Sequence, residues 1–221
     1  MKTELKSICE IIKPASEERM RAARVHLDHV AKPLKALGRL EDVLVRLAGM
    51  AELRRDYRKC AVVMCADNGV VAEGVTQTGS DVTAVVAGNI LNGKASVCCM
   101  AGVAGAEVLA VDIGMLADVP GVRNCKVAYG TKNFRHGPAL TKEEAQTAVM
   151  HGVNVARELA ENGFSMLSAG EMGIGNTTSS SAVASVLLGR APAEMTGRGA
   201  GLSSLQLQNK IRVIEDALAC N

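Results

Sequence analysis

Three mainly apolar runs, each ending in an acidic residue beside glycine, constrain the fold of this chain most strongly. Their sequences are CAVVMCADNGV (60–70), AEVLAVDIGM (106–115) and FSMLSAGEMG (164–173). An apolar run without polar alternation, closed by a turn signal, is typical of a strand that is buried on both faces in a parallel sheet. A shorter run, CKVAYGT (125–131), predicts one further strand.

Helical patterns occupy the segments between and after these strands. Residues 80–103 carry apolar side chains at helical spacing, and Thr141 and Glu144 have the S/T-x-x-E spacing of a capping box at the start of another helix. Further helices are predicted over about 179–188 and over 205–220. Strands that alternate with helices predict an α/β fold with a doubly wound, mainly parallel, Rossmann-like sheet.

The N-terminal quarter has only helical patterns. Apolar residues recur at three- and four-residue steps between Val25 and Leu47. Pro33 divides this segment, because proline removes a backbone donor inside a helix, so one amphipathic helix is predicted to begin near it. We therefore expect a helical segment over residues 1–56 and a nucleotide-binding α/β domain over residues 57–221.

Composition excludes several functional classes. The 221 residues are 48% hydrophobic but only 2% aromatic, with a net charge of +2 and no basic block, so a nucleic-acid partner is not expected. The N-terminus lacks a secretory apolar core, and no apolar stretch is expected to span a membrane. Seven cysteines without a C-x-x-C pair favour free thiols over a disulfide framework, which predicts a cytoplasmic protein.

The sequence GEMGIGNTTSSS (170–181) combines three glycines, one acid and a run of hydroxyl side chains where the last strand meets a helix. Free N–H groups at a helix N-terminus bind anions, and glycines allow a ligand to approach the backbone closely. The spacing matches neither the dinucleotide fingerprint nor the triphosphate P-loop. We therefore expect a single phosphate on a ribose, with Glu171 accepting hydrogen bonds from sugar hydroxyls. The alternative is a tight strand–helix turn that Thr177 caps.

Other polar segments give weaker signals. The loop TGRGAGL (196–202) places Arg198 among glycines, either as an anion contact or in a flexible surface loop. His136 is a candidate general base, but a solvated loop histidine is the simpler interpretation. His26 and His29 lie three residues apart without carboxylates or cysteines to complete a metal site, so no metal is expected.

Six segments follow the order and spacing of one known family: KPLKALGRLEDVLVRLA, CADNGVVAEGV, VDIGM, YGTKNF with GPALT, GEMGIGNTT and GRGAG. From about Lys32 to Leu218, the chain resembles the nicotinate-nucleotide:dimethylbenzimidazole phosphoribosyltransferases, and GEMGIGNTT is highly specific for them. The resemblance implies transfer of phosphoribose from nicotinate mononucleotide to an aromatic lower-ligand base, giving α-ribazole phosphate for cobamide (cobalamin) assembly and free nicotinate, without a cofactor. It also implies a two-domain dimer in which residues 1–56 belong to a small helical domain.

The resemblance further implies which residues bind substrate. They come from the glycine-rich motif and from a lysine in QNKIRVIEDAL: Glu171, Gly173, Gly175, Asn176, Thr177, Thr178 and Lys210. Val85 occupies a base-facing position that is often polar in the family, which suggests a less polar acceptor such as a phenol. The family's general base, a glutamate in a GEGTG-like segment, is expected beyond Asn221, so no catalytic residue is assigned.

Three functions are compatible with the sequence. The first is a C-terminally short phosphoribosyltransferase that forms a homodimer. The second is a non-catalytic subunit that binds nucleotide and supports a full-length homologue in a heterodimer. The third is a sugar-phosphate-binding regulator that does no chemistry. An unpaired sheet edge in the shorter chain would favour association with another chain.

Overall fold

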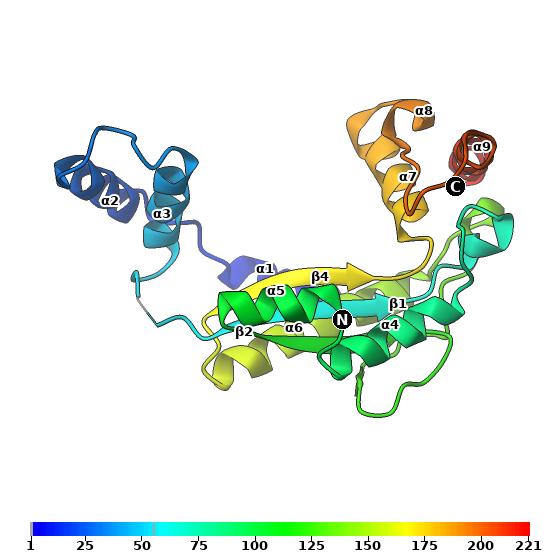
Figure 1. Cartoon of the computed structure of the whole chain (residues 1–221), viewed down its shortest axis with the longest axis horizontal. Helices are drawn as coiled ribbons and strands as arrows, with labels where there is room; N and C mark the ends of the chain where they lie inside the picture. Colours follow the sequence, from blue (N-terminus) through cyan, green and yellow to red (C-terminus); the bar gives the residue numbers. More distant parts are fainter. Residues whose placement is uncertain (1, 55) are drawn as a thin grey trace. The chain divides into compact units, whose positions relative to one another are not determined.

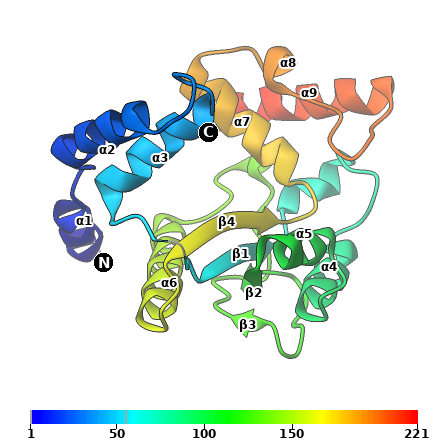
Figure 2. The same ribbon diagram turned by 60° about the vertical axis from the view of Figure 1, so that its left-hand side comes forward.

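The computed structural model describes residues 2–54 and 56–221, which divide into two compact units. The smaller unit extends to Tyr57 and is helical, and the larger unit spans Arg58–Asn221. Figures 1 and 2 show the elements of both units from two directions.

The smaller unit contains three helices: α1 (Lys2–Ile11), α2 (Glu17–His29) and α3 (Arg39–Met50). Helices α2 and α3 pack against each other. The helix that we predicted to begin near Pro33 begins at Arg39 instead. Lys35 and Gly38 have φ angles of 58° and 55°, and this left-handed backbone keeps residues 33–38 out of the helix.

The larger unit is built on a four-stranded sheet in the order β3-β2-β1-β4, with every neighbouring pair parallel. Its strands are β1 (Lys59–Ala66), β2 (Ala106–Gly114), β3 (Arg123–Asn124) and β4 (Met166–Met172). The predicted α/β fold with a parallel sheet is confirmed. The expected strand over 125–131 is wrong, because the chain pairs with β2 only at Arg123 and Asn124 and then turns along the end of that strand.

The helices of the larger unit cover both faces of this sheet. In chain order the helical elements are η1 (Gly69–Glu73), α4 (Asp81–Leu91), α5 (Ser96–Ala104), η2 (Phe134–His136), α6 (Lys142–Glu161), α7 (Asn176–Leu188), α8 (Pro192–Met195) and α9 (Ser204–Cys220). One apolar core joins Val63 and Cys65 of β1 to Ala87 and Ile90 of α4. The second core lies on the opposite face and includes Val155 of α6, so β1 is buried on both sides.

The predicted helix over residues 80–103 is two helices. Helix α4 ends at Leu91, and Gly93 follows with a φ of 70°, so the chain turns before α5 begins. By length and composition alone, Asp81–Ala104 meets the criteria for a membrane span, contrary to our expectation that no stretch would. Both helices pack against β2.

The cysteines occupy very different environments, yet all seven are free thiols. Cys65 is the most buried, at 0% exposure. Desolvation, followed by the nearby Asp112 carboxylate, raises the pKa of its thiol to about 11, so this cysteine stays protonated.

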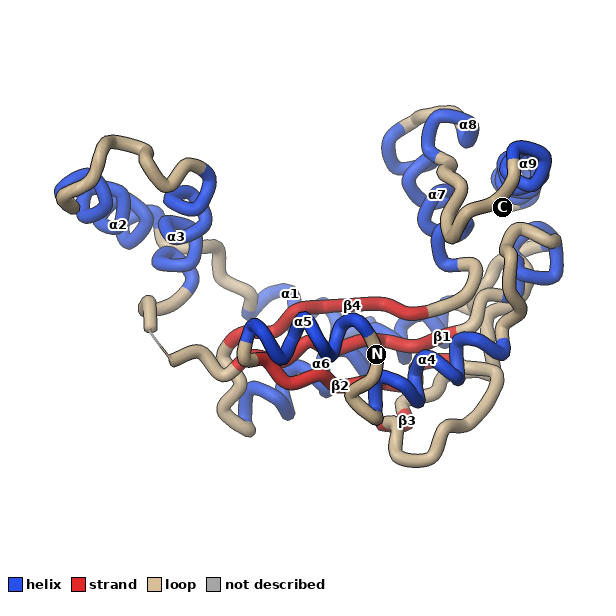
Figure 3. Tube along the Cα trace, viewed as in Figure 1, coloured by secondary structure: helices blue, strands red, loops and turns tan. Residues whose placement is uncertain are grey.

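The direction of the chain reverses around β1. The chain runs from β1 through α4 and α5 to β2, and it returns through α6 to β4 on the other side of β1. Helices α7 and α9 lie beyond the carboxyl ends of the strands, together with the loops that leave those ends (Figure 3). In open α/β sheets, ligands bind at the carboxyl edge next to such a reversal.

Candidate functional site

A cavity of about 120 Å³ lies at this carboxyl edge. It is lined by residues 75–78 after η1, by residues 173–177 between β4 and α7, by the loop around Gly199 and by Lys210 of α9. The volume is roughly that of four water molecules, which suits a phosphate group. A groove between α2 and α3 is larger, at about 460 Å³, but alanine and leucine dominate its lining and offer few donors to an anion.

Two glycines let the chain turn sharply from β4 into α7. A Cβ at Gly173 would overlap a backbone carbonyl oxygen of β1, so only glycine fits there. Gly175 has a φ of 89°, and a Cβ there would lie 2.9 Å from the Val71 side chain. Between them, the Ile174 amide donates to the hydroxyl of Thr83 on α4 at 3.1 Å, which fixes the turn against the sheet.

The N-terminus of α7 has no side-chain cap, unlike those of the two longest helices of this unit. Helices α6 and α9 begin with complete capping boxes, at Thr141 and Ser203, that occupy backbone N–H groups. At α7 the N-cap is Gly175, and no side chain caps the helix. The alternative that Thr177 caps this turn is therefore wrong. The positive end of the helix dipole faces the cavity, which favours an anion.

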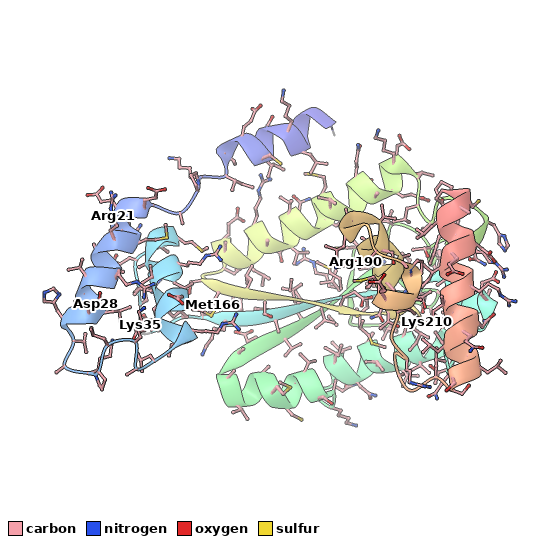
Figure 4. The ribbon with its side chains drawn as sticks, turned by 90° about the horizontal axis from the view of Figure 1, so that it is seen from above. Arg21, Asp28, Lys35, Met166, Arg190 and Lys210 are labelled. Atoms are coloured by element: carbon pink, nitrogen blue, oxygen red, sulfur yellow. The ribbon has the colours of Figure 1, made fainter. Side chains whose placement is uncertain are left out.

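Lys210 supplies the positive charge of the cavity. It lies on the face of α9 toward α7 (Figure 4), and only 1% of the residue is exposed. Its Nζ donates to Thr177 Oγ1 at 2.7 Å and to the Gly197 carbonyl oxygen at 3.3 Å. No ion pair joins it to a carboxylate in the described part of the chain, and burial lowers the pKa of its ammonium group. A buried cation without a carboxylate favours an anionic ligand.

The loop before α9 approaches this lysine closely at Gly199. The φ of Gly199 is 56°, and a Cβ at this position would lie 3.0 Å from Thr177 Oγ1 and 3.5 Å from Lys210 Nζ. Any side chain here would therefore enter the space that an anion would occupy. The glycine is required both for the backbone conformation and for the volume of the cavity.

Two long polar side chains hold the rim of the cavity. Arg198 lines it while donating to the carbonyl oxygen of Leu202 at 2.7 Å and to Ser204 Oγ at 3.0 Å. Gln77 lines the opposite side and donates to the Gly201 carbonyl oxygen at 2.6 Å. The Arg198 bonds order the loop before α9, and the Gln77 bond ties this loop to the one after η1, so the cavity is closed by segments distant in the sequence.

Glu171 lies beside the cavity, near the end of the edge strand β4. Its carboxylate accepts a short hydrogen bond from the Asn176 amide on the first turn of α7. Desolvation raises the pKa of the Glu171 carboxyl, and the Asn176 bond opposes this shift, although the residue as a whole is exposed. The site therefore combines a cationic pocket with one adjacent carboxyl group.

The structure brings five of the eight predicted substrate-binding residues to the cavity: Gly173, Gly175, Asn176, Thr177 and Lys210. Glu171 is one hydrogen bond away through Asn176. Thr178 is fully buried, and its hydroxyl has no partner within the described residues. Val85 is 60% exposed on α4 and is not part of the cavity lining. The roles of all eight in substrate binding stay predictions.

Gln77, Thr76 and Thr78 line the cavity but were not among the predicted substrate-binding residues, although the resemblance places them in the base-facing segment that contains Val85. In the sequence they stand in an ordinary polar turn, TQTGSD, with no spacing that marks a ligand. Their position could have indicated a role. The turn belongs to the connection that leaves the carboxyl end of β1 and lies just after η1, and the loops at the carboxyl ends of neighbouring parallel strands lie close together.

Comparison with known proteins shows the family of this chain. A family model described as phosphoribosyltransferase matches residues 12–221. The chain is 45% identical over 214 residues to the nicotinate-nucleotide–dimethylbenzimidazole phosphoribosyltransferase of Ruminiclostridium cellulolyticum, and 42% identical over 222 residues to that of Alkaliphilus metalliredigens. These alignments cover 95% and 98% of this chain but 61% and 64% of the relatives.

Solved structures show the same relation. The crystal structure of CobT from Thermus thermophilus matches with a TM-score of 0.83 at 40% identity, covering 91% of this chain and 62% of that one. The chain thus spans about three fifths of the length of the curated relatives that it matches. Because the family model covers nearly the whole chain and the relatives are more than 40% identical, this chain belongs to the phosphoribosyltransferase family that the model describes.

Proposed function

We propose that this chain binds the ribose phosphate of nicotinate mononucleotide and takes part in transfer of phosphoribose to an aromatic base of the dimethylbenzimidazole type. The observation that carries the proposal is Lys210, a buried cation without a carboxylate partner among the described residues, which faces the uncapped N-terminus of α7. The relatives, whose names contain nicotinate nucleotide and dimethylbenzimidazole, support this choice of substrates.

In this proposal the cavity binds the phosphate group. Lys210 and the positive end of the α7 dipole neutralise its charge, and the Thr177 hydroxyl donates to it once the lysine turns to the ligand. At the edge of the cavity, Glu171 accepts hydrogen bonds from the ribose hydroxyls and Asn176 donates to them. Thr178 supports this turn from its buried position.

The reaction needs little further help at the sugar. The bond from the ribose C1′ to the nicotinate ring nitrogen breaks, and a nitrogen of the acceptor base forms the new bond to C1′. Nicotinate leaves readily because its ring nitrogen is cationic in the nucleotide. The contribution of the chain is therefore to position the reactants, and a general base must take the proton of the acceptor.

The same proposal covers the setting of the protein. We infer a cytoplasmic enzyme of cobamide assembly that needs no cofactor, acting as a homodimer or in a heterodimer with a full-length homologue. Residues 1–56 contribute to a small helical domain, and Val85 contacts the acceptor base, with a less polar acceptor such as a phenol preferred. Equal turnover of benzimidazole and phenol by the complete enzyme would count against that preference.

Calorimetric titration of the purified chain with nicotinate mononucleotide tests the binding site. We expect saturable binding that Lys210→Met weakens at least about tenfold, because a charge-assisted contact to phosphate is lost. Lys142→Met, which removes an exposed lysine at the start of α6, is the matched control and should bind like the wild type. Equal binding by the Lys210→Met variant would overturn the proposal.

A second candidate is a subunit that binds the sugar phosphate and does no chemistry. It is favoured by the polar side chains that line the cavity, which are amides, hydroxyls, an arginine and a lysine, groups that hold an anion rather than accept a proton. Nicotinate release separates the two candidates. Release by the chain alone with dimethylbenzimidazole supports the enzyme, whereas release only after a full-length relative is added supports the subunit.

A further inference from the structure

Helix α9 carries Lys210 and follows the glycine-rich loop that closes the cavity. The loop that precedes it contains Gly199 and Gly201, both with positive φ. Bonds from Arg198 to Leu202 and Ser204 and from Gln77 to Gly201 order this loop, but they reach only the first residue of α9. The contacts of α9 with other segments must therefore decide where the ammonium group of Lys210 lies.

One such contact is apolar. Val213, one turn after Lys210 on the buried face of α9, packs against Val70 and Val75, with Phe134 of η2 beside them. Apolar contacts of this kind favour burial but tolerate small shifts of the helix, since dispersion has little directionality. A directional contact is needed to set the position more finely.

A charged bridge between three segments provides it. The guanidinium of Arg135, in η2, donates a short hydrogen bond to Glu73 at the end of η1, and it donates to Asp216 Oδ2 on α9 at 2.7 Å. The Arg135 and Glu73 side chains are 29% and 13% exposed and that of Asp216 is 45% exposed, so the bridge is shielded from water at Glu73 and open to it at α9. The Arg135 guanidinium holds the pKa of the Glu73 carboxyl below its usual range, which keeps the bridge charged.

Glu73 reaches α9 at a second point. Its backbone carbonyl oxygen accepts from Asn209 Nδ2 at 2.9 Å, and Asn209 is the neighbour of Lys210 in the sequence. Its carboxylate is further held by Asn133 at 2.6 Å and by His136 at 3.2 Å. The helix is thus attached on both sides of Lys210. One attachment is at the neighbouring Asn209, and the other is at Asp216, roughly 9 Å from Lys210 along the helix axis.

We propose that Arg135 is a positioning residue that, by bridging Glu73 and Asp216, holds α9 so that Lys210 stays buried against Thr177. Arg135 does not line the cavity, so it acts through the helix and not on the ligand. A planar guanidinium suits this task because it bonds two carboxylates on different segments at once, which a lysine cannot do with the same geometry. The consequence for phosphate binding rests on the function proposed above, whereas the position of Lys210 does not.

The test measures the rate at which an amine-specific acetylating reagent modifies Lys210 in the full chain, followed by peptide mass spectrometry. Arg135→Met and Asp216→Asn should speed acetylation of Lys210 about tenfold, because local opening of α9 becomes easier. Asp216→Glu, which retains the charge, should restore most of the protection. Acetylation of Lys126, a buried lysine in the same unit, reports general unfolding and should not change.

Arg123→Met is the matched control. Arg123 is 28% exposed and also bridges two segments, through Glu158 at 2.6 Å, but this pair does not touch α9. An unchanged rate at Lys210 in both Arg135→Met and Asp216→Asn, or an equal increase in Arg123→Met, would overturn the proposal. So would protection lost equally in Asp216→Asn and Asp216→Glu.

Titration of the same variants with inorganic phosphate separates this inference from the proposed function. If Arg135 acts through Lys210, Arg135→Met weakens phosphate binding in the wild-type background but has no further effect in a Lys210→Met background. Equal losses in both backgrounds would contradict the positioning role. If the wild-type chain binds no phosphate while acetylation responds as expected, the proposed function fails and the positioning role stands.

Discussion

Two buried lysines of the larger unit differ in what surrounds them. The Lys126 side chain is 7% exposed and pairs with Asp112 at 3.2 Å and with Asp118 at 2.7 Å. Burial alone would lower the pKa of Lys126, but the two carboxylates outweigh it and the pKa is raised. Lys210 has no such carboxylate in the described structure, and burial lowers its pKa.

The comparison separates a lysine whose charge is paired within the structure from one whose charge the proposed ligand would pair. Lys126 also donates to the Met115 carbonyl oxygen and lies 4.0 Å from the centre of the Tyr129 ring, so its surroundings are complete. Lys210 donates to one hydroxyl and one carbonyl oxygen, both neutral. Its missing counter-charge is what a bound phosphate would supply.

The largest expected effect comes from replacing Lys126, whose charge is paired with two carboxylates. Lys126→Met should lower the free energy of unfolding by about 3 kcal/mol, because it leaves Asp112 buried without its cation. Urea denaturation measures this loss. Phosphate affinity should not change, and Lys94→Met, at an exposed position, should alter stability by less than about 0.5 kcal/mol. If Lys126→Met lost no more stability than Lys94→Met, Lys126 would not be a structural charge and would not differ from Lys210 in this respect.

Replacing Lys210 should change the free energy of unfolding in the opposite direction. Lys210→Met removes a desolvated charge from an apolar helix face, so we expect the free energy of unfolding to be unchanged or to rise by about 1 kcal/mol. At the same time phosphate binding should weaken by about 2 kcal/mol. Urea denaturation and calorimetry on the same sample check both. A loss of stability comparable to that of Lys126→Met would show that Lys210 is structural.

The volume of the cavity can be reduced without touching a charge. Gly199→Ala places a methyl group next to Thr177 Oγ1 at a positive φ, so phosphate binding should weaken by about 1–2 kcal/mol. Gly197→Ala is the matched control, because nothing lies within 4 Å of its Cβ and its φ is not positive. Calorimetric titration with phosphate compares the two. Equal affinity in both variants would place the anion elsewhere.

The smallest expected effect is a difference in alkaline pH dependence. Since the folded-state pKa of Lys126 is raised, its stabilisation is complete below the unfolded pKa and is lost as the pH rises through the folded pKa. The folded-state pKa of Lys210 is lowered, so its cost to stability is relieved as the pH rises through that value. Urea denaturation from about pH 8 upward, with each lysine-to-methionine variant as reference, should give slopes of opposite sign. Saturating phosphate should bring the Lys210 slope toward that of Lys126.

Local sequence patterns predicted much of the fold. Three strands, the capping box at Thr141 and the helix that ends near Cys220 are where the patterns indicated. The errors occur where tertiary contacts or single residues override a pattern. Residues 33–38 have helical apolar spacing but turn at Lys35 and Gly38, and residues 125–131 have strand composition but lie at the end of β2 with no length of strand to pair with.

The sequence by itself determined the parallel sheet, its buried strand β1 and the glycine turn at the start of α7, because each depends on neighbouring residues or on simple periodicity. The expectation that all three apolar runs are buried on both faces is wrong for β4, which is an exposed edge strand of the described sheet. The family resemblance, rather than any spacing, indicated Lys210. Only the tertiary structure decided that this lysine is buried against Thr177 while Lys126 is paired with Asp112. Burial and charge pairing depend on which distant segments meet, and no local pattern in the sequence specifies that.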